Sequence, residues 1–241
     1  MKFYSVTVDS RERVGKYTIL RYQWDGAIEP GQFVMARGGS FPYTLDPLLG
    51  RPLSFYDYDG ETASLLFEVR GRGTALLDKA RQIEVTVPLG QGFRIEHASR
   101  RSALLGGGIG VAPMKILSRR LEFLDVAHDV FLGFADARTA PIQQDFPGAQ
   151  VATIDGSAGT RGTVLDAAPP LEDYDSIYAC GPNAMLAAIK SVASNGCQLS
   201  VEEKMGCGNG SCNGCVVPIK GRGYIRSCVE GPVFEAEALA W

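Results

Sequence analysis

The sequence has little histidine, no excess of basic charge and no long apolar run. Its two histidines, His97 and His128, lie beside no other candidate catalytic residue, so a Ser-His-Asp triad or a histidine-based hydrolase is not expected. A formal net charge of −3 provides no basic surface for nucleic acid. No run of about 18 apolar residues predicts a membrane span, and the opening MKFYSVTV has the pattern of a strand, not of a signal peptide. We therefore expect a cytoplasmic protein that binds neither nucleic acid nor membrane.

Turn residues separate short β-rich runs over the first hundred residues. These runs are 3–8, 16–23, 32–37, 65–69 and 83–88, and a helical run at 72–82 interrupts them. Short strands at this spacing predict a small antiparallel β-barrel.

Strand and helix patterns alternate from about residue 101 onward. Strands are expected at 103–105, 129–133, 150–154 and 176–179, and helices at 112–125 and 183–194. This alternation predicts a doubly wound α/β domain with a parallel sheet.

Four of the six cysteines fall close together near the carboxyl end. They are Cys207, Cys212, Cys215 and Cys228, with the spacing C-x4-C-x2-C and a fourth cysteine further on. This is the plant-type spacing for a 2Fe-2S cluster, and the glycines among them let a loop wrap round it. A zinc site remains the alternative, although zinc sites usually pair two C-x2-4-C knuckles. Cys180 and Cys197 lie outside this group and have the character of small core residues.

Residues 106–113 read GGGIGVAP and stand between a predicted strand and a predicted helix. Free N–H groups at such a junction favour a phosphate, so we expect Gly107, Gly108 and Gly110 to contact a dinucleotide. The sequence Cys180-Gly181-Pro182 follows another strand of the same sheet and would flank the nicotinamide.

Two residues are candidates for the adenosine end of the nucleotide. Asp136 would accept a hydrogen bond from a ribose hydroxyl of NAD, whereas Arg138 would pair with the 2′-phosphate of NADP. The sequence favours NAD and leaves NADP open.

Two further motifs are RPLS at 51–54 and GRGT at 71–74. Each alone is also a fair turn-plus-strand or helix N-cap. The order RPLS, GRGT, GGGIGVAP, ACGP and C-x4-C-x2-C resembles the ferredoxin reductase superfamily, and most closely the electron-transfer subunits of dihydroorotate dehydrogenase B. The stretches EEKMGC at 202–207 and CVEGPVF at 228–234 are similar to the cluster domain of those subunits.

The resemblance implies a set of flavin-binding residues. Arg51, Pro52, Leu53 and Ser54 would line the flavin, Gly73 and Thr74 would begin a helix that receives the FAD phosphates, and Glu68 and Val69 would flank the adenosine side. The sequence departs from the family at Gly50, where a second arginine is common, and at Asn209 and Asn213, which make the cluster loop more polar.

Together these features predict a FAD-binding β-barrel at 1–98, a NAD-binding α/β domain at 99–200 and a 2Fe-2S domain at 201–241. The resemblance implies an oxidoreductase subunit that passes electrons from an FMN-containing dihydroorotate dehydrogenase catalytic subunit through 2Fe-2S and FAD to NAD, in a heterotetramer of two of each. A partner is expected because the remaining sequence leaves no room for a (β/α)8 barrel of about 250 residues. The alternatives are a flavin subunit of an NADPH:ferredoxin or sulfide-type oxidoreductase, a stand-alone ferredoxin reductase, and a zinc-stabilised binding module without enzymatic activity.

Overall fold

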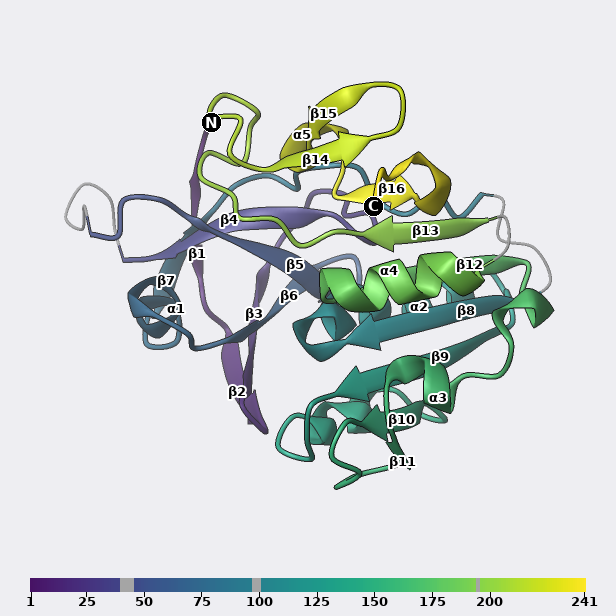
Figure 1. Ribbon diagram of the computed structural model, residues 1–241. Coiled ribbons are helices and arrows are strands. Elements are labelled where there is room, and N and C mark those ends of the chain that lie inside the picture. The colour runs from purple at the N-terminus through teal and green to yellow at the C-terminus, as the bar shows by residue number, and fades with distance from the viewer. Residues whose placement is uncertain (40–45, 97–100, 194–195) are drawn as a thin grey trace.

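The computed structural model describes residues 1–39, 46–96, 101–193 and 196–241. Two seven-stranded sheets lie side by side, and a two-stranded sheet sits beside them near the carboxyl end (Figure 1). His97, and Ser194 at the end of the expected helix 183–194, lie outside the described residues. Within the described part of the chain, no helix is both long and apolar enough to cross a membrane.

The first sheet is antiparallel and comes from the amino-terminal part of the chain. Its strands are β1 (Tyr4–Thr7), β2 (Ser10–Val14), β3 (Tyr17–Gln23), β4 (Phe33–Gly38), β5 (Arg51–Tyr58), β6 (Thr62–Glu68) and β7 (Gln82–Val85). They pair in the order β1-β7-β4-β5-β6-β3-β2, so the ladder ends at β1 and β2 and does not close among the described residues. The expected barrel is therefore a curled half-barrel. The helical run at 72–82 forms only α1 (Arg72–Leu77), because the chain turns into β7 at Gln82.

The second sheet is parallel except at one edge. Its strands are β8 (Ser102–Gly107), β9 (His128–Phe134), β10 (Gln150–Thr153), β11 (Thr160–Arg161), β12 (Ser176–Cys180), β13 (Cys197–Ser200) and β16 (Val233–Glu235). They pair in the order β11-β10-β9-β8-β12-β13-β16, and only β16 runs antiparallel to its neighbour. The predicted parallel α/β sheet is thus confirmed.

Helices cover both faces of this second sheet. The longer ones are α2 (Ala112–Phe123) and α4 (Asn183–Val192), and short ones are α3 (Val164–Ala167), η1 (Gly108–Val111), η2 (Ala140–Asp145) and η3 (Leu171–Asp173). Because neighbouring residues of a strand point to opposite faces, Leu104 packs with the α2 residue Leu117, whereas Leu105 packs with the α4 residue Ile189.

The two sheets share one hydrophobic core. Tyr17, Ile19 and Leu66 of the first sheet pack in the same cluster as Leu104 and Met114 of the second. Strands β3 and β6 therefore bury both faces, which explains their nearly continuous apolar sequences. This shared core fixes the position of the flavin-motif strand β5 relative to the glycine turn.

The carboxyl-terminal segment leaves the second sheet after β13 and returns to it. It forms β14 (Val216–Ile219), β15 (Gly223–Arg226), α5 (Ser227–Glu230) and η4 (Ala236–Ala238), and β16 pairs with β13. The segment that carries the four clustered cysteines is therefore anchored on the second sheet. The predicted domain division at residue 201 stays a prediction.

Candidate functional site

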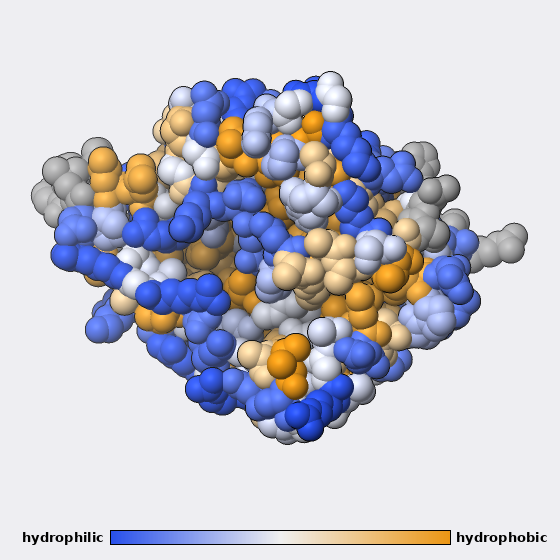
Figure 2. Space-filling model, in the orientation of Figure 1, coloured by the Kyte–Doolittle hydropathy of each residue, from blue (hydrophilic) through white to orange (hydrophobic). Residues whose placement is uncertain are grey.

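A cavity of about 180 Å³ lies where the two sheets and the carboxyl-terminal segment meet. Its lining includes Pro52, Leu53 and Ser54 of β5, Ile109 and Ala112 after β8, Cys180 of β12, and Glu202, Met205 and Pro232 of the carboxyl-terminal segment. Three motifs that are far apart in the sequence are thus brought to one place. In the orientation of Figure 1, the surface of the molecule is hollowed near the centre of the view, with apolar side chains visible inside a mainly hydrophilic rim (Figure 2).

Three ionisable groups of this cavity, Cys180, Glu202 and Glu203, have raised pKa values, and burial is the main cause for each. Burial raises the pKa of the Cys180 thiol, with the nearby Glu202 carboxylate adding to the effect, so Cys180 stays a neutral thiol. Burial also raises the pKa of the Glu202 carboxyl, although part of this residue remains exposed. The cavity therefore has a neutral, mainly apolar wall beside a carboxyl group, which suits a flat aromatic ring system.

Arg51 reaches from β5 to the first turn of α1. A methyl group added at Gly73 would lie 2.4 Å from Nε of Arg51, so the glycine makes room for the guanidinium. The Arg51 side chain also donates a hydrogen bond of 2.6 Å to the carbonyl of Leu49. A guanidinium held beside free N–H groups at a helix start is a fitting place for a phosphate.

Thr74 uses its hydroxyl within its own turn. The oxygen accepts hydrogen bonds from the N–H groups of Arg70 (3.0 Å) and Gly71 (3.2 Å) and donates to the carbonyl of Gly71 (3.0 Å). Thr74 therefore shapes the loop before α1, and a direct contact with the FAD phosphates stays a prediction.

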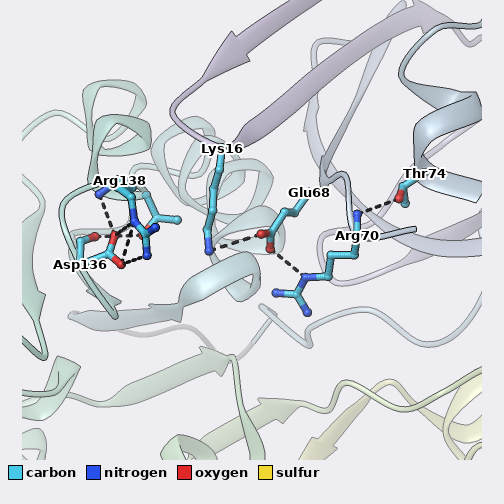
Figure 3. A network of polar contacts seen from close by, with 7 residues as sticks. Lys16, Glu68, Arg70, Thr74, Asp136 and Arg138 are labelled. Carbon is cyan, nitrogen blue, oxygen red and sulfur yellow. Dashed lines mark hydrogen bonds and ion pairs between the residues drawn. The ribbon is translucent and has the colours of Figure 1, made fainter. Parts of the chain in front are cut away.

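Glu68 stands at the centre of a polar network between the two sheets (Figure 3). Its carboxylate pairs with Nζ of Lys16 at 3.4 Å and with Nε of Arg70 at 2.8 Å. Desolvation opposes its ionisation, but Arg70 and Lys16 outweigh this and lower the pKa of Glu68. The next residue, Val69, is exposed. The position of Glu68 and Val69 beside the adenosine of FAD stays a prediction.

A second cavity, of about 480 Å³, opens along the carboxyl ends of β8, β9 and β12. Gly107, Gly108 and Pro182 line it, together with Lys16 and Arg70 from the first sheet. No motif in the sequence indicates Lys16 or Arg70 as a site residue, because their position at this cavity depends on how the first sheet packs against the second.

The glycine turn touches the end of β12. A methyl group at Gly110 would lie 2.3 Å from the carbonyl oxygen of Cys180, so only glycine permits this approach. Gly108 has a φ of +56°, the left-handed region that favours glycine. The structure thus brings the GGGIGVAP and ACGP motifs to the same edge of the sheet.

Asp136 and Arg138 are the candidates for contact with the adenosine end of the nucleotide. Their side chains are hydrogen-bonded to each other. Nη2 of Arg138 lies 2.6 Å from Oδ2 of Asp136, and Nε lies 3.1 Å from both carboxylate oxygens. These bonds lower the pKa of Asp136 to about 2, so the pair is ionised at neutral pH.

The four clustered cysteines form two pairs. The N–H of Cys212 donates to Sγ of Cys207 at 3.4 Å, and the thiol of Cys228 is hydrogen-bonded to that of Cys215. Cys215 and Cys228 are buried, whereas Cys212 is exposed.

The protonation of these thiols follows from their surroundings. Burial opposes ionisation of Cys207, but N–H groups of Asn209, Cys212 and Ser211 outweigh it and lower the pKa of this thiol to about 6. Burial, followed by the neighbouring Cys215, raises the pKa of Cys228 to about 12.

This pairing distinguishes the two kinds of metal site. In the described ranges, no three His, Cys, Asp or Glu side chains gather in a way that would hold one ion. A zinc ion needs its thiolates round one point, whereas a 2Fe-2S cluster takes two thiolates on each iron. Two cysteine pairs, with Cys207, Cys212 and Cys215 in the glycine-rich loop and Cys228 in α5, fit the two-iron cluster better. Cys197 packs in the core of the second sheet, as expected.

Comparison with known proteins agrees with this arrangement. The iron-sulfur cluster binding domain of dihydroorotate dehydrogenase B, as a family, matches residues 202–240. The electron transfer subunit of dihydroorotate dehydrogenase B (NAD(+)) from Clostridium acetobutylicum is 38% identical over 220 residues, which cover 88% of this chain and 86% of that protein. The subunit of the same name from a Geobacillus species is 39% identical over 221 residues, 86% of this chain and 85% of that protein.

Among solved structures, that of an NADH-dependent reduced ferredoxin-NADP oxidoreductase has a TM-score of 0.81 and 23% identity, and the match covers 98% of this chain and 90% of that one. The half-barrel and the parallel sheet thus form a ferredoxin reductase-like fold. The identity to the two bacterial subunits decides the family within this class. The chain belongs to the electron transfer subunits of dihydroorotate dehydrogenase B, which confirms the resemblance seen in the sequence.

Proposed function

We propose that this chain carries electrons from a dihydroorotate dehydrogenase catalytic subunit that holds FMN, through a 2Fe-2S cluster and FAD, to NAD. The observation that carries this proposal is the meeting of β5, the end of β12 and the cysteine segment round one cavity. A flavin in this cavity would contact residues of β5, of the end of β12 and of the cysteine segment. FAD supplies the necessary chemistry when bound, since it exchanges two electrons with nicotinamide and single electrons with a cluster.

The residues around the first cavity would hold FAD. Pro52, Leu53 and Ser54 would line the ring system, while Arg51 and the α1 start at Gly73 would bind the phosphates. Thr74 would fix the shape of that loop, with Glu68 and Val69 at its adenosine side.

The residues at the edge of the second sheet would hold NAD. Gly107, Gly108 and Gly110 would receive the pyrophosphate, and the stretch Cys180, Gly181 and Pro182 would place the nicotinamide beside the flavin. Cys180 lies in the wall of the flavin cavity, and Pro182 lies in that of the nucleotide cavity, which supports a shared boundary between the two.

Cys207, Cys212, Cys215 and Cys228 would bind the cluster as two pairs. Exposed Cys212 puts the cluster site near the surface, where a partner subunit would reach it. We further propose a heterotetramer of two chains of each kind, located in the cytoplasm.

The decisive experiment is dihydroorotate-dependent NAD reduction by the native complex, purified anaerobically through a tag on this chain. We expect turnover that disappears when the catalytic subunit is removed. A preparation with flavin and cluster absorption but no such turnover would point instead to a ferredoxin- or sulfide-type oxidoreductase. A colourless, zinc-containing protein would support the binding-module alternative.

A further inference from the structure

Arg226 is held beside the cysteine pair Cys215 and Cys228. It ends β15, where it stands opposite Val216, the residue that follows Cys215. It also precedes α5, which carries Cys228 two residues further on. The N–H of Ser227 donates to the carbonyl of Cys215 at 2.8 Å, and this bond joins the β14–β15 hairpin to α5. The backbone of Arg226 is therefore fixed between two proposed cluster ligands.

The side chain of Arg226 reaches the loop that carries the other two cysteines. Nη1 donates to the carbonyl of Gly210 at 3.3 Å, and Gly210 lies between Cys207 and Cys212 in the sequence. A methyl group at Gly210 would lie 2.8 Å from Cγ2 of Val229 and 3.2 Å from Nη1, so the loop approaches α5 closely here. One guanidinium thus connects both cysteine pairs.

Glu230 holds the guanidinium in this place. Nη2 of Arg226 donates to Oε1 of Glu230 at 2.6 Å, and the backbone N–H of Arg226 donates to Oε2 at 3.0 Å. The two side chains are 38% and 32% exposed, so the ion pair by itself contributes little to stability. Its position matters more, because it fixes one cation and one anion at the cysteine loop.

The cysteine loop itself carries no charged side chain. Residues 205–215 include no Asp, Glu, Lys or Arg. On the side toward the first sheet, Cys215 and Cys228 pack in one apolar group with Met35 of β4. Apolar surroundings strengthen the effect of a nearby charge. The ion pair therefore supplies fixed charges to a loop that has none of its own.

We infer that Arg226 and Glu230 tune the reduction potential of the 2Fe-2S cluster in opposite directions, with Arg226 as a positioning residue that joins the two cysteine pairs. This inference rests on the proposed function and adds the residues that adjust its electron path. One-electron reduction adds a negative charge to a cluster held by thiolates, and nearby charge is one of the factors that set its potential. Arg226 favours the reduced form and raises the potential, whereas Glu230 opposes this effect.

The test is a redox titration of the full complex, purified anaerobically, with the reduced cluster followed by EPR. Arg226→Gln removes the cation, Arg226→Lys keeps it without the forked donors, Glu230→Gln removes the anion, and a double variant combines both glutamines. The matched controls are Arg21→Gln and Glu12→Gln, which alter an ion pair of similar exposure on β3 and β2. In the order of the first sheet, β3 lies three strands from β4, which packs against the cysteines.

We expect Arg226→Gln to lower the midpoint potential and Glu230→Gln to raise it. Each should change the equilibrium constant for one-electron reduction by about threefold to tenfold, or about 28 to 59 mV. Arg226→Lys should stay near the wild-type potential, and the double variant should lie between the two single variants. Both shifts should shrink at high salt, because ions screen a partly exposed charge. The two controls should leave the potential unchanged.

Shifts of the same sign in Arg226→Gln and Glu230→Gln would overturn the inference, because lost packing and not charge would then explain them. Unchanged potentials in both, equal shifts in the controls, or a potential in Arg226→Lys as low as in Arg226→Gln would do the same. Where Arg226→Gln does not retain the cluster, a potential that fails to rise in Glu230→Gln overturns it.

The cluster signal of the wild-type complex separates this inference from the proposed function. Absence of any 2Fe-2S signal would reject the proposed electron path and this inference together. An intact signal with potentials that do not respond to the charges of Arg226 and Glu230 would reject this inference alone.

Discussion

The hydroxyl of Tyr56 donates a hydrogen bond of 2.6 Å to Oδ2 of Asp145, and this bond joins β5 of the first sheet to η2 of the second. The ring of Tyr56 is buried and packs edge-on against Phe146, with ring centroids 6.4 Å apart. Nζ of Lys115 donates to the backbone carbonyl of Asp145 at 2.6 Å, which fixes the backbone from which that carboxylate extends. The strand that begins with the RPLS motif is thus tied, toward its other end, to the second sheet.

Replacing Tyr56 with phenylalanine should weaken this connection. Hydrogen bonds to charged groups contribute about 1.5 to 3 kcal/mol, and we expect the low end because water can reach half-buried Asp145 in the variant. The Tm of the flavin-loaded protein should fall by several degrees in a chain of this size. Scanning calorimetry measures this change, with Tyr224→Phe as the control because Tyr224 is 72% exposed. Equal Tm values for both variants would contradict the prediction.

Stability should decrease in alkaline solution because of buried tyrosines. Burial raises the pKa of Tyr17, Tyr22 and Tyr56 above the ordinary value of 10.0, and Glu68 adds to the effect at Tyr17 and Asp145 at Tyr56. Above about pH 10 the unfolded chain loses the hydroxyl protons of these tyrosines, whereas the folded chain keeps them. The stabilisation is therefore complete below pH 10 and declines as the pH rises, by up to about 1.4 kcal/mol per pH unit for each tyrosine.

Urea denaturation across this range would measure the decline, and tyrosinate absorbance should appear together with unfolding. Phenolate absorbance that develops fully in the folded protein near pH 10 would show that these hydroxyls are accessible and would contradict the expectation.

The sequence predicted those parts of the site that depend on local spacing. The positions of Cys207, Cys212 and Cys215 in one loop, and of the glycine turn after β8, follow from residues that are neighbours along the chain. The parallel sheet was also predictable, because its buried strands read as apolar runs separated by helices.

Contacts between distant segments were not predictable in this way. The hairpin residue Lys16 meets Glu68 only after β3 and β6 pair. Strand β16 joins the second sheet because β13 leaves an open edge there, and nothing in the three residues of β16 indicates that partner. The hydrogen bonds between Asp136 and Arg138 are also not evident from the sequence, because each side chain by itself is equally suited to contact a nucleotide.

Arg51→Gln should weaken the retention of FAD. The variant keeps a polar side chain but loses the charge and the forked donors that suit a phosphate. We expect the Kd for FAD to rise by about tenfold or more, measured as flavin fluorescence released on dilution. Arg101→Gln is the control. Arg101 is exposed and pairs with Asp129, and it lies before the amino end of β8, whereas the glycine turn follows the carboxyl end of this strand. Equal flavin retention in both variants would exclude Arg51 as a phosphate ligand.

Cys212→Ser should separate the two halves of the electron path. Cys212 does not line the first cavity, where we propose that FAD binds, so the variant should keep FAD and should still reduce a dye with NADH. Cluster absorption should be lost, and dihydroorotate-dependent NAD reduction should fall by about a hundredfold or more, because the proposed electron path runs from the partner through the cluster to the flavin. Cys197→Ala, in the core of the second sheet, should keep the cluster spectrum. An unchanged rate of partner-dependent NAD reduction in Cys212→Ser would mean that electrons reach FAD by another route.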